Sequence, residues 1–459
     1  MMVAVNKHLS LFASWLVGLA VIASSLPVAA RAQMTMPAGT PSQTVTTIYL
    51  DPVNGKTVNE LVALALENNG EIIALRKEAE AGEALVNQAG LRANPSVAVN
   101  GTRQLGGTDN NVMIQGEQPL ELGGRRPARI RVARQELEIR KQAVAERERQ
   151  VAADVRSKFG EALAAATKLT FADNVIDMEK VMFELVAAKV TEGRTPPLEQ
   201  NMESVELNRM RAERETAEGV VEMRMFELRN LVGMNPEEPL RLRGDFAALL
   251  GIIPPQDIAT ERALQLRPDI VGARAVEQLQ AARIEQAKTE GKIDADVMLG
   301  YQRMHTGFPL LGVEQSTGAL LPIDSKFHYF TFGVRLNLPL TNRNQGTIEA
   351  AKLEGDAARS RREFGELTVK REIASAYARY NRALRAMEIY RVGVRDQAAA
   401  NIDVVRQTYD LGSKTLIDYI GEHHRYMATE NGFIDAELEA YLARVDILRA
   451  TSAAELTNK

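Results

Sequence analysis

Two very long helical patterns constrain the possible folds of this chain more than any other feature. They extend from Pro127 to Val190 and from Gly346 to Leu411. At about 1.5 Å of rise per residue, each helix has a length of roughly 95–100 Å. Such a helix does not fit inside a compact globular domain, so we expect these helices to pack side by side in the wall of a tube. Small and branched residues at helical spacing form the expected seam of the first one: Ile130, Ala133, Leu137, Val144, Val151, Val155 and Ala162.

The chain also repeats one plan of elements. Each half is predicted to contain an entry helix, two strands, the long helix and a return helix. The spacing of the halves differs because residues 305–326, which include glycine, proline and threonine, form an insert in the second half only. One duplicated domain is therefore expected, with a first repeat over 57–250 and a second over 251–459. Three matches occur in the same order in both: Ala65–Ile72 with Ala263–Ile270, Pro119-Leu120 with Pro339-Leu340, and Gly193 with Gly412.

The lengths of the elements predict how they pack. Entry helices are expected at 57–93 and 256–291, and return helices at Leu198–Leu231 and Leu416–Ala450. One entry helix and one return helix together are about as long as one long helix. We therefore expect the two short helices end to end beside the long one, with the linker 235–256 at mid-height. The strands are expected near 95–104, 112–121, 294–304 and 328–340.

The N-terminal segment has the features of a secretory signal peptide over residues 1–32. A short basic start precedes an apolar run over residues 9–23, and Ala30-Arg31-Ala32 forms a small-x-small cleavage site before Gln33. An N-terminal membrane anchor is the alternative reading, but the run is shorter than the roughly 18 residues that a spanning helix needs. We expect an exported chain with a leader at 33–56, in which any later membrane span is a β-barrel.

The four predicted strands alternate between apolar and polar residues. About ten residues per strand with this alternation is typical of a transmembrane β-barrel, although a half-buried soluble sheet alternates in the same way. Four strands cannot close a barrel around a channel, so a barrel requires several chains. Export without a helical span favours the barrel. The apolar positions are Val97, Val99, Val112, Ile114, Val297, Leu299, Tyr301, Phe330, Phe332, Val334, Leu336 and Leu338.

Composition and missing motifs exclude several function classes. The chain has no cysteine, which excludes disulfides, thiolate metal sites, cysteine nucleophiles and a lipid-anchored N-terminal cysteine. Its formal net charge of -4 gives no electrostatic basis for nucleic-acid binding. Gly123-Gly124-Arg125 lacks the Gly-Lys-Ser/Thr of a phosphate loop, and Gly-x-Ser-x-Gly does not occur. We expect neither an enzyme nor a bound cofactor.

Two motifs, together with the duplication, carry a resemblance to the TolC family of outer-membrane efflux channels. Gln118–Arg126 (QPLELGGRR) lies where a strand meets the long helix, and Tyr409–Asp418 (YDLGSKTLID) forms the second helical turn. The resemblance covers about residues 57–452. Its junction motif is most similar to the branch that serves heavy-metal efflux pumps of the cobalt-zinc-cadmium type.

The resemblance implies an α+β membrane protein that forms a homotrimer. Each chain would contribute four strands to a 12-stranded transmembrane β-barrel, surrounded by outer-membrane lipid, and its long antiparallel helices to an α-helical barrel in the periplasm of a Gram-negative cell. The implied partners are a periplasmic membrane-fusion adaptor and an inner-membrane pump of the resistance-nodulation-division type.

The resemblance also implies roles for the two helical turns, where family members dock the adaptor and close the pore. Asp418 matches the family's pore-constricting acid, and Lys414 matches a basic residue that tethers the closed state. The alternative for Asp418 is a purely structural role at the start of a helix, where its negative charge interacts favourably with the helix dipole. Pro196-Pro197 and Gly421 depart from the family pattern. The residues implied at the adaptor-docking tips are Gly193, Arg194, Thr195 and Leu198 in the first turn and Gly412, Ser413 and Leu416 in the second.

Few side chains offer a metal site. His423 and His424 are adjacent on a predicted helix, point about 100° apart and cannot chelate together within one chain, which leaves only a site across a trimer. Met34 and Met36 form a thioether pair in the leader that could bind a soft metal. His305 and His328 flank the insert and are expected in a loop or at the barrel rim.

These observations favour a passive outer-membrane exit duct of a tripartite efflux pump, with heavy-metal cations as the expected cargo. A multidrug efflux channel and a type I protein-secretion channel of the same fold are the alternatives. A periplasmic coiled-coil scaffold without a pore is disfavoured by the four alternating strands.

Overall fold

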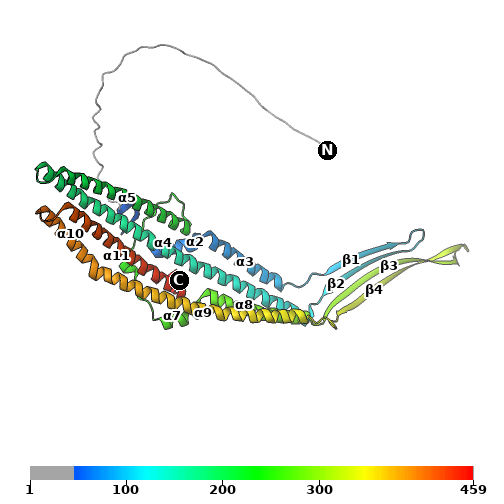
Figure 1. The fold of residues 1–459 in the computed structure, drawn as a ribbon. Coiled ribbons are helices and arrows are strands. Elements are labelled where there is room, and N and C mark those ends of the chain that lie inside the picture. Colours follow the sequence, from blue (N-terminus) through cyan, green and yellow to red (C-terminus); the bar gives the residue numbers. More distant parts are fainter. Residues whose placement is uncertain (1–45, 458–459) are drawn as a thin grey trace, which may run out of the picture. The chain divides into compact units, whose positions relative to one another are not determined.

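The computed structural model describes residues 46–457, so the predicted signal peptide and the Met34–Met36 pair lie outside the described residues. The order helix, helix, strand, strand, long helix, return helix occurs twice (Figure 1). The first half contains α1 (Thr46–Tyr49), α2 (Val58–Asn68), α3 (Gly70–Gly90), β1 (Ser96–Arg103), β2 (Asn110–Pro119), the 3-10 turn Leu122–Gly124, α4 (Arg125–Thr191) and α5 (Pro197–Val232). A linker helix α6 (Phe246–Leu249) follows.

The second half repeats this order with one additional irregularity. It contains α7 (Gln256–Leu266), α8 (Pro268–Glu290), β3 (Asp294–Val313), β4 (Leu320–Asn337), α9 (Gln345–Ile389), α10 (Arg395–Asp410), α11 (Leu416–Thr451) and α12 (Ala454–Thr457). The second long helix is interrupted by one π-helical turn, Tyr390–Val394, which separates α9 from α10. Tyr390 lies against Gly432 of α11, where a Cβ would come within 2.9 Å of the tyrosine Oη.

Each predicted entry helix is in fact two helices, which corrects the sequence-based expectation. Asn69 leaves the helical conformation (φ -66°, ψ 117°), and its side chain caps α3 by accepting from the backbone N–H of Glu71. Arg267 breaks the second entry helix in the same way, because the proline at 268 disfavours helical backbone in the residue before it. The short helices pack along the long ones, α3 against α4 and α8 against both α4 and α9.

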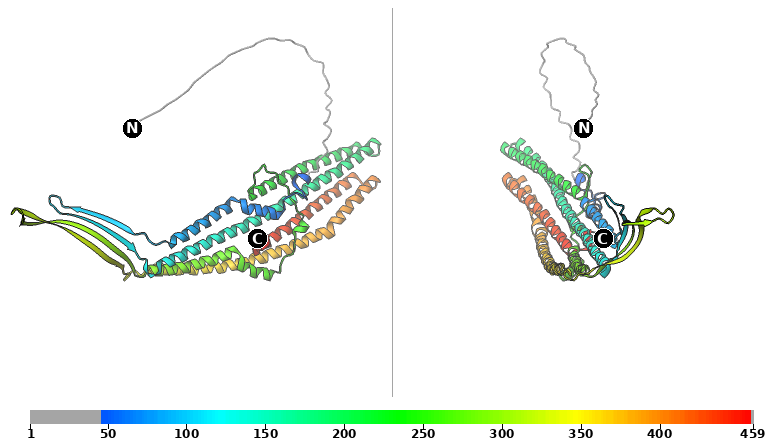
Figure 2. Two further views of the ribbon diagram at one scale, coloured as in Figure 1. Left: turned by 180° about the vertical axis from the view of Figure 1, so that it is seen from behind. Right: turned by 90° about the vertical axis from the view of Figure 1, so that its right-hand side faces the viewer.

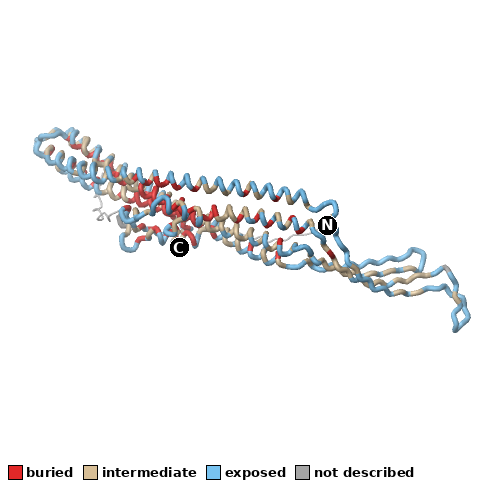
Figure 3. Tube along the Cα trace, turned by 90° about the horizontal axis from the view of Figure 1, so that it is seen from below, coloured by how far each residue is buried: buried red, intermediate tan, exposed pale blue. Residues whose placement is uncertain are grey.

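The two helical hairpins lie side by side. Helix α5 packs antiparallel along α4, α11 packs along α9 and α10, and α11 also contacts α4 (Figure 2). Gly160 of α4 permits one of the closest approaches, because a Cβ there would lie 2.5 Å from the ring of Tyr441 on α11. Buried residues gather in the middle of these helices (Figure 3). This core includes Leu61, Phe159, Met225, Leu228 and Tyr441.

The four strands form one antiparallel sheet in the order β1-β2-β3-β4. The register aligns Val99 with Ile114, Ile114 with Tyr301, and Tyr301 with Phe330. A row of apolar side chains therefore crosses all four strands on one face. Along β4 these side chains are strongly exposed, with 80% for Phe330 and 85% for Phe332. Among the residues that the structure describes, nothing covers that face.

The structure corrects the predicted strand bounds of 304 and 328, which left out the insert at 305–326. Most of it extends β3 and β4 as a long hairpin, and only residues 314–319 connect the strands. The register shifts between Gly307 and Leu311, around Pro309, which has no N–H to give to a ladder. His305 and His328 consequently lie on strands, where His305 contacts Asp324 (2.8 Å) and His328 contacts Tyr301 (2.6 Å).

Among the helices of residues 46–457, none combines the length and the hydropathy that crossing a membrane requires.

Candidate site at the two helical turns

Each hairpin ends in a tight turn at a glycine. Gly193 and Gly412 have φ values of 70° and 78°, in the left-handed region that glycine adopts without strain. The N–H of Arg194 donates to the carbonyl of Lys189 (2.9 Å), and the N–H of Ser413 donates to that of Thr408 (2.9 Å). These bonds satisfy carbonyls at the ends of α4 and α10, so both turns are closed helix ends.

The second turn continues into α11 through a capping box. The Thr415 side chain accepts from the backbone N–H of Asp418 (3.2 Å), and Asp418 Oδ2 accepts from the Thr415 N–H (3.0 Å). The Thr415 backbone bond, followed by the Thr415 hydroxyl, lowers the pKa of Asp418 below its ordinary value, with a smaller contribution from Lys414. Asp418 is therefore ionised at neutral pH. Both it and Lys414 are exposed, and no ion pair joins them among the described residues.

The first turn begins its return helix differently. Pro196 precedes α5 and Pro197 occupies its first position, where the missing N–H costs nothing. Thr195 donates to Glu199 Oε2 (3.3 Å), while Leu198 is 65% exposed. This turn therefore has no capping box, and it presents an apolar side chain to solvent.

A group of polar contacts joins the two hairpins directly behind the turns. The buried ammonium of Lys189 on α4 donates to the carbonyls of Tyr409 and Asp410 (both 3.1 Å) and lies 3.2 Å from the Asp410 carboxylate. The Tyr409 hydroxyl donates to Glu199 Oε2 on α5 (2.8 Å). Burial, then the bond to Glu199, raises the pKa of Tyr409, so its hydroxyl remains a donor. These contacts bind the end of α10 to both helices of the first hairpin.

The fold has long antiparallel helices in two repeats, glycine turns at their tips and a four-stranded sheet with an uncovered apolar face. A comparison of the sequence with models of protein families agrees with this architecture. The family model of the outer membrane efflux proteins matches residues 61–234 and 259–453. The chain belongs to this family. It is an outer-membrane transport protein and not an enzyme.

Three similar proteins support the assignment to the outer membrane efflux proteins. The cobalt-zinc-cadmium resistance protein CzcC of Cupriavidus metallidurans is 24% identical over 327 residues, which is 70% of this chain and 72% of CzcC. A crystal structure of CusC superposes with a TM-score of 0.71 at 15% identity and covers 86% of this chain and 91% of CusC. The open state of the MtrE channel of Neisseria gonorrhoeae gives 0.67 at 18% identity, with 86% and 88% covered. The two solved structures establish the fold.

In this efflux protein the structure brings most of the sequence-predicted tip residues to exposed positions. Gly193, Arg194, Leu198, Gly412 and Ser413 are exposed, and Thr195 is half-buried. Leu416 is different, since it is 1% exposed and packs against Met182, Val186 and Tyr419. Its neighbour Ile417 is 67% exposed and Leu411 80% exposed. The apolar surface of the second tip is thus made by Leu411 and Ile417.

The contacts made by Lys189, Tyr409 and Glu199 were not anticipated from the sequence. Tyr409 belongs to the quoted turn motif, but no spacing rule indicates that its partner is a lysine on the other long helix. The adjacent histidines separate as the helix geometry requires: His423 is fully buried, and His424 faces solvent beside Glu206 (2.7 Å). Among the described residues, no group of three or more His, Asp or Glu side chains is arranged to hold a metal ion.

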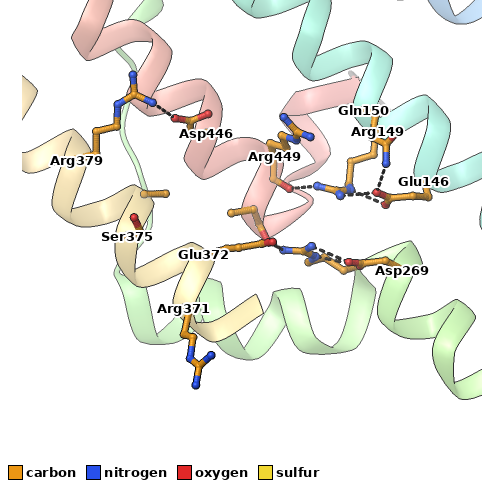
Figure 4. Close-up of a pocket in the computed structure, with 13 residues that line it drawn as sticks. Glu146, Arg149, Gln150, Asp269, Arg371, Glu372, Ser375, Arg379, Asp446 and Arg449 are labelled. Atoms are coloured by element: carbon orange, nitrogen blue, oxygen red, sulfur yellow. Dashed lines mark hydrogen bonds and ion pairs between the residues drawn. The ribbon is translucent and has the colours of Figure 1, made fainter. Parts of the chain in front are cut away.

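A charged pocket between α4, α8, α9 and α11 is held together by internal ion pairs (Figure 4). Arg267, 4% exposed, makes two bonds to Asp269 (3.0 and 2.7 Å) and one to Glu372 (2.7 Å). Its third partner is the carbonyl of Ala450 on α11 (3.0 Å). The residue that breaks the entry helix thus fastens it to both helices of the second hairpin.

Proposed function

We propose that this outer membrane efflux protein forms a homotrimeric exit duct. The observation that carries the proposal is the sheet, whose apolar face is uncovered and whose outer strands β1 and β4 each have a free edge. Free edges of long strands pair readily with other strands. Three copies joined β1 to β4 would close a 12-stranded barrel with its apolar rows facing lipid, which satisfies both features at once.

The helices would continue this barrel as a periplasmic tube, with the turns at its far end. There the tips Gly193-Arg194-Thr195 and Gly412-Ser413 would dock a membrane-fusion adaptor, which in turn joins an inner-membrane pump of the resistance-nodulation-division type. Exposed Leu198, Leu411 and Ile417 provide apolar anchors for an adaptor helix. Leu416 would support this surface from beneath, because its side chain is buried.

We assign the gate to Asp418, with Lys414 beside it. The capping box uses Oδ2 of Asp418, and Oδ1 makes no hydrogen bond among the described residues. Three ionised Asp418 side chains near a threefold axis would form an acidic ring that attracts cations. Lys414 would offset the mutual repulsion of that ring in the closed state.

Heavy-metal cations are the proposed cargo, because the curated relative CzcC is named for cobalt, zinc and cadmium resistance. The test is deletion of the gene, followed by growth in graded Co²⁺, Zn²⁺ and Cd²⁺ and in a panel of dyes and detergents. We expect lower tolerance of the metals, restored by the wild-type gene. Loss of tolerance to dyes and detergents alone would favour a general multidrug channel instead.

A further inference from the structure

A buried cluster of ionisable side chains joins the two hairpins several turns above the tips. Glu179 on α4, Glu203 on α5 and His423 on α11 all have 0% exposure. The His423 Nδ1 lies 3.4 Å from Glu179 Oε2, which also accepts from the Tyr419 hydroxyl (3.3 Å). The Tyr419 and His423 rings stack with centroids 5.7 Å apart. We call Glu179, Glu203, Tyr419 and His423 the acid–histidine cluster.

Most polar atoms of the cluster lack a hydrogen-bond partner among the described residues when its carboxyl groups are ionised. Within residues 46–457, five of its buried atoms make no hydrogen bond: both oxygens of Glu203, Oε1 of Glu179 and both ring nitrogens of His423. Leaving so many polar atoms unpaired is costly. A proton on Glu203 removes much of this cost, because the carboxyl group then donates to Glu179 and one buried negative charge disappears.

Burial shifts the pKa values of the cluster toward uncharged side chains. It raises the pKa of Glu203 to about 9, with a further contribution from Glu179, and it raises the pKa of Glu179. Burial also lowers the pKa of His423 to about 4, so the imidazole is neutral at neutral pH. The charged and titratable groups around the cluster and its neighbours Glu206 and Tyr409 include Glu179 on α4; Glu199, Glu203 and Arg209 on α5; Arg406 on α10; and Tyr419, His423 and His424 on α11.

We propose that the acid–histidine cluster is a proton-dependent latch, in which a proton shared by Glu203 and Glu179 holds the first hairpin against α11. A shared proton fits better than a bound cation, because these side chains are not arranged to hold a metal ion in the described structure. The latch does not depend on the proposed cargo or gate. It makes separation of the hairpins easier as the pH rises.

The direction of the pH dependence follows from the pKa of Glu203 in the closed and the open state. When the hairpins separate, its pKa returns toward the ordinary 4.5, while in the closed state it is about 9. Between these values opening releases a proton, so the opening equilibrium grows by up to about tenfold for each pH unit. The lowered pKa of His423 has the opposite effect: between about pH 4 and its ordinary pKa of 6.5, opening takes up a proton and becomes less favourable as the pH rises. The net response is therefore clearest between about pH 6.5 and 9.

The test is hydrogen–deuterium exchange of the full chain in detergent with EDTA, read on peptides of α5 and α11 that flank the cluster. After correction for the intrinsic pH dependence of exchange, we expect wild-type exchange to rise severalfold to about tenfold per pH unit across this window. Glu203→Gln, which imitates the protonated acid, should flatten that response to less than about twofold. Glu184→Gln removes an exposed acid on α4 and should respond as the wild type does.

Equal pH responses of wild type and Glu203→Gln would overturn the latch. So would a wild-type response that appears without EDTA and vanishes with it, because a bound cation would then be responsible. Infrared spectroscopy of the wild type provides a test that does not depend on the variant folding. We expect the carbonyl band of a buried protonated carboxyl group at neutral pH that fades above about pH 9, and its absence at neutral pH would contradict the proposal.

Discussion

The ammonium of Lys189 lies 4.3 Å from the centroid of the Tyr409 ring while it donates a hydrogen bond to the carbonyl of the same residue. Lys189 is near the end of the first long helix and Tyr409 near the end of the second. One buried cation thus joins the ends of two helices, each of which leads into a different turn. Any movement that separates the hairpins at their tips must break this contact.

Lys189→Met should therefore loosen the tips. The variant keeps an apolar stem of similar length but loses hydrogen bonds from a charged donor, which stabilise by about 1.5–3 kcal/mol. We expect a higher resting conductance in planar bilayers. Lys180→Met is the matched control, because Lys180 is half exposed on the same helix and, in the described part of the chain, pairs only with Asp177. Equal conductance of Lys189→Met and the control would show that the contact does not restrain the pore.

Asp418→Asn separates the two roles of the gate residue. Asparagine retains a side-chain oxygen that can accept from the Thr415 N–H, but it removes the charge that the lowered pKa maintains at neutral pH. We expect raised Ca²⁺ or Mg²⁺ on the periplasmic side to reduce the wild-type conductance and to affect the variant much less. Asp418→Ala should also lose the block, with additional loss of the cap. An unchanged block in Asp418→Asn would leave this residue its role at the helix start alone.

Arg267→Ala should lower the stability of the fold, and it leaves the residues of the proposed gate unchanged. The change removes the hydrogen bonds that a buried charged donor makes to Asp269, Glu372 and the Ala450 carbonyl, and bonds of this kind stabilise by about 1.5–3 kcal/mol. Arg371→Ala is the control, since Arg371 lines the same pocket but is exposed and points away from the ion pairs (Figure 4). Surface changes of that kind stay within about 0.5 kcal/mol. Denaturant unfolding in detergent compares them, and equal midpoints would refute the role of Arg267.

The elements of this fold are visible in the sequence because their periodicities are long and regular. Both long helices were predicted to within a few residues at each end, and the alternation of Phe330, Phe332 and Val334 identified β4. The extension of β3 and β4 into the insert was not predicted, because glycine and Pro309 interrupt the alternation of apolar and polar residues there. The break at Arg267 could have been predicted from Pro268, and the break at Asn69 from the Asn69-Gly70 pair, since asparagine favours a helix N-cap and Asn-Gly marks a turn.

The site was predictable only in its local part. Glycines at 193 and 412 mark the turns, because a left-handed helix end favours glycine. The contact of Lys189 with Tyr409, and the meeting of Glu179, Glu203 and His423, join residues more than 20 positions apart on different helices. Those pairs depend on the relative rotation of packed helices, which no sequence period specifies.

The number of chains in the assembly tests the central proposal most directly. Native mass spectrometry of the protein purified in detergent should give three copies, and the same preparation should form channels in bilayers. Three copies of this four-stranded sheet would make the proposed 12-stranded barrel, with the outer strands β1 and β4 of neighbouring chains paired. A stable monomer or dimer that forms conducting channels would contradict the shared barrel.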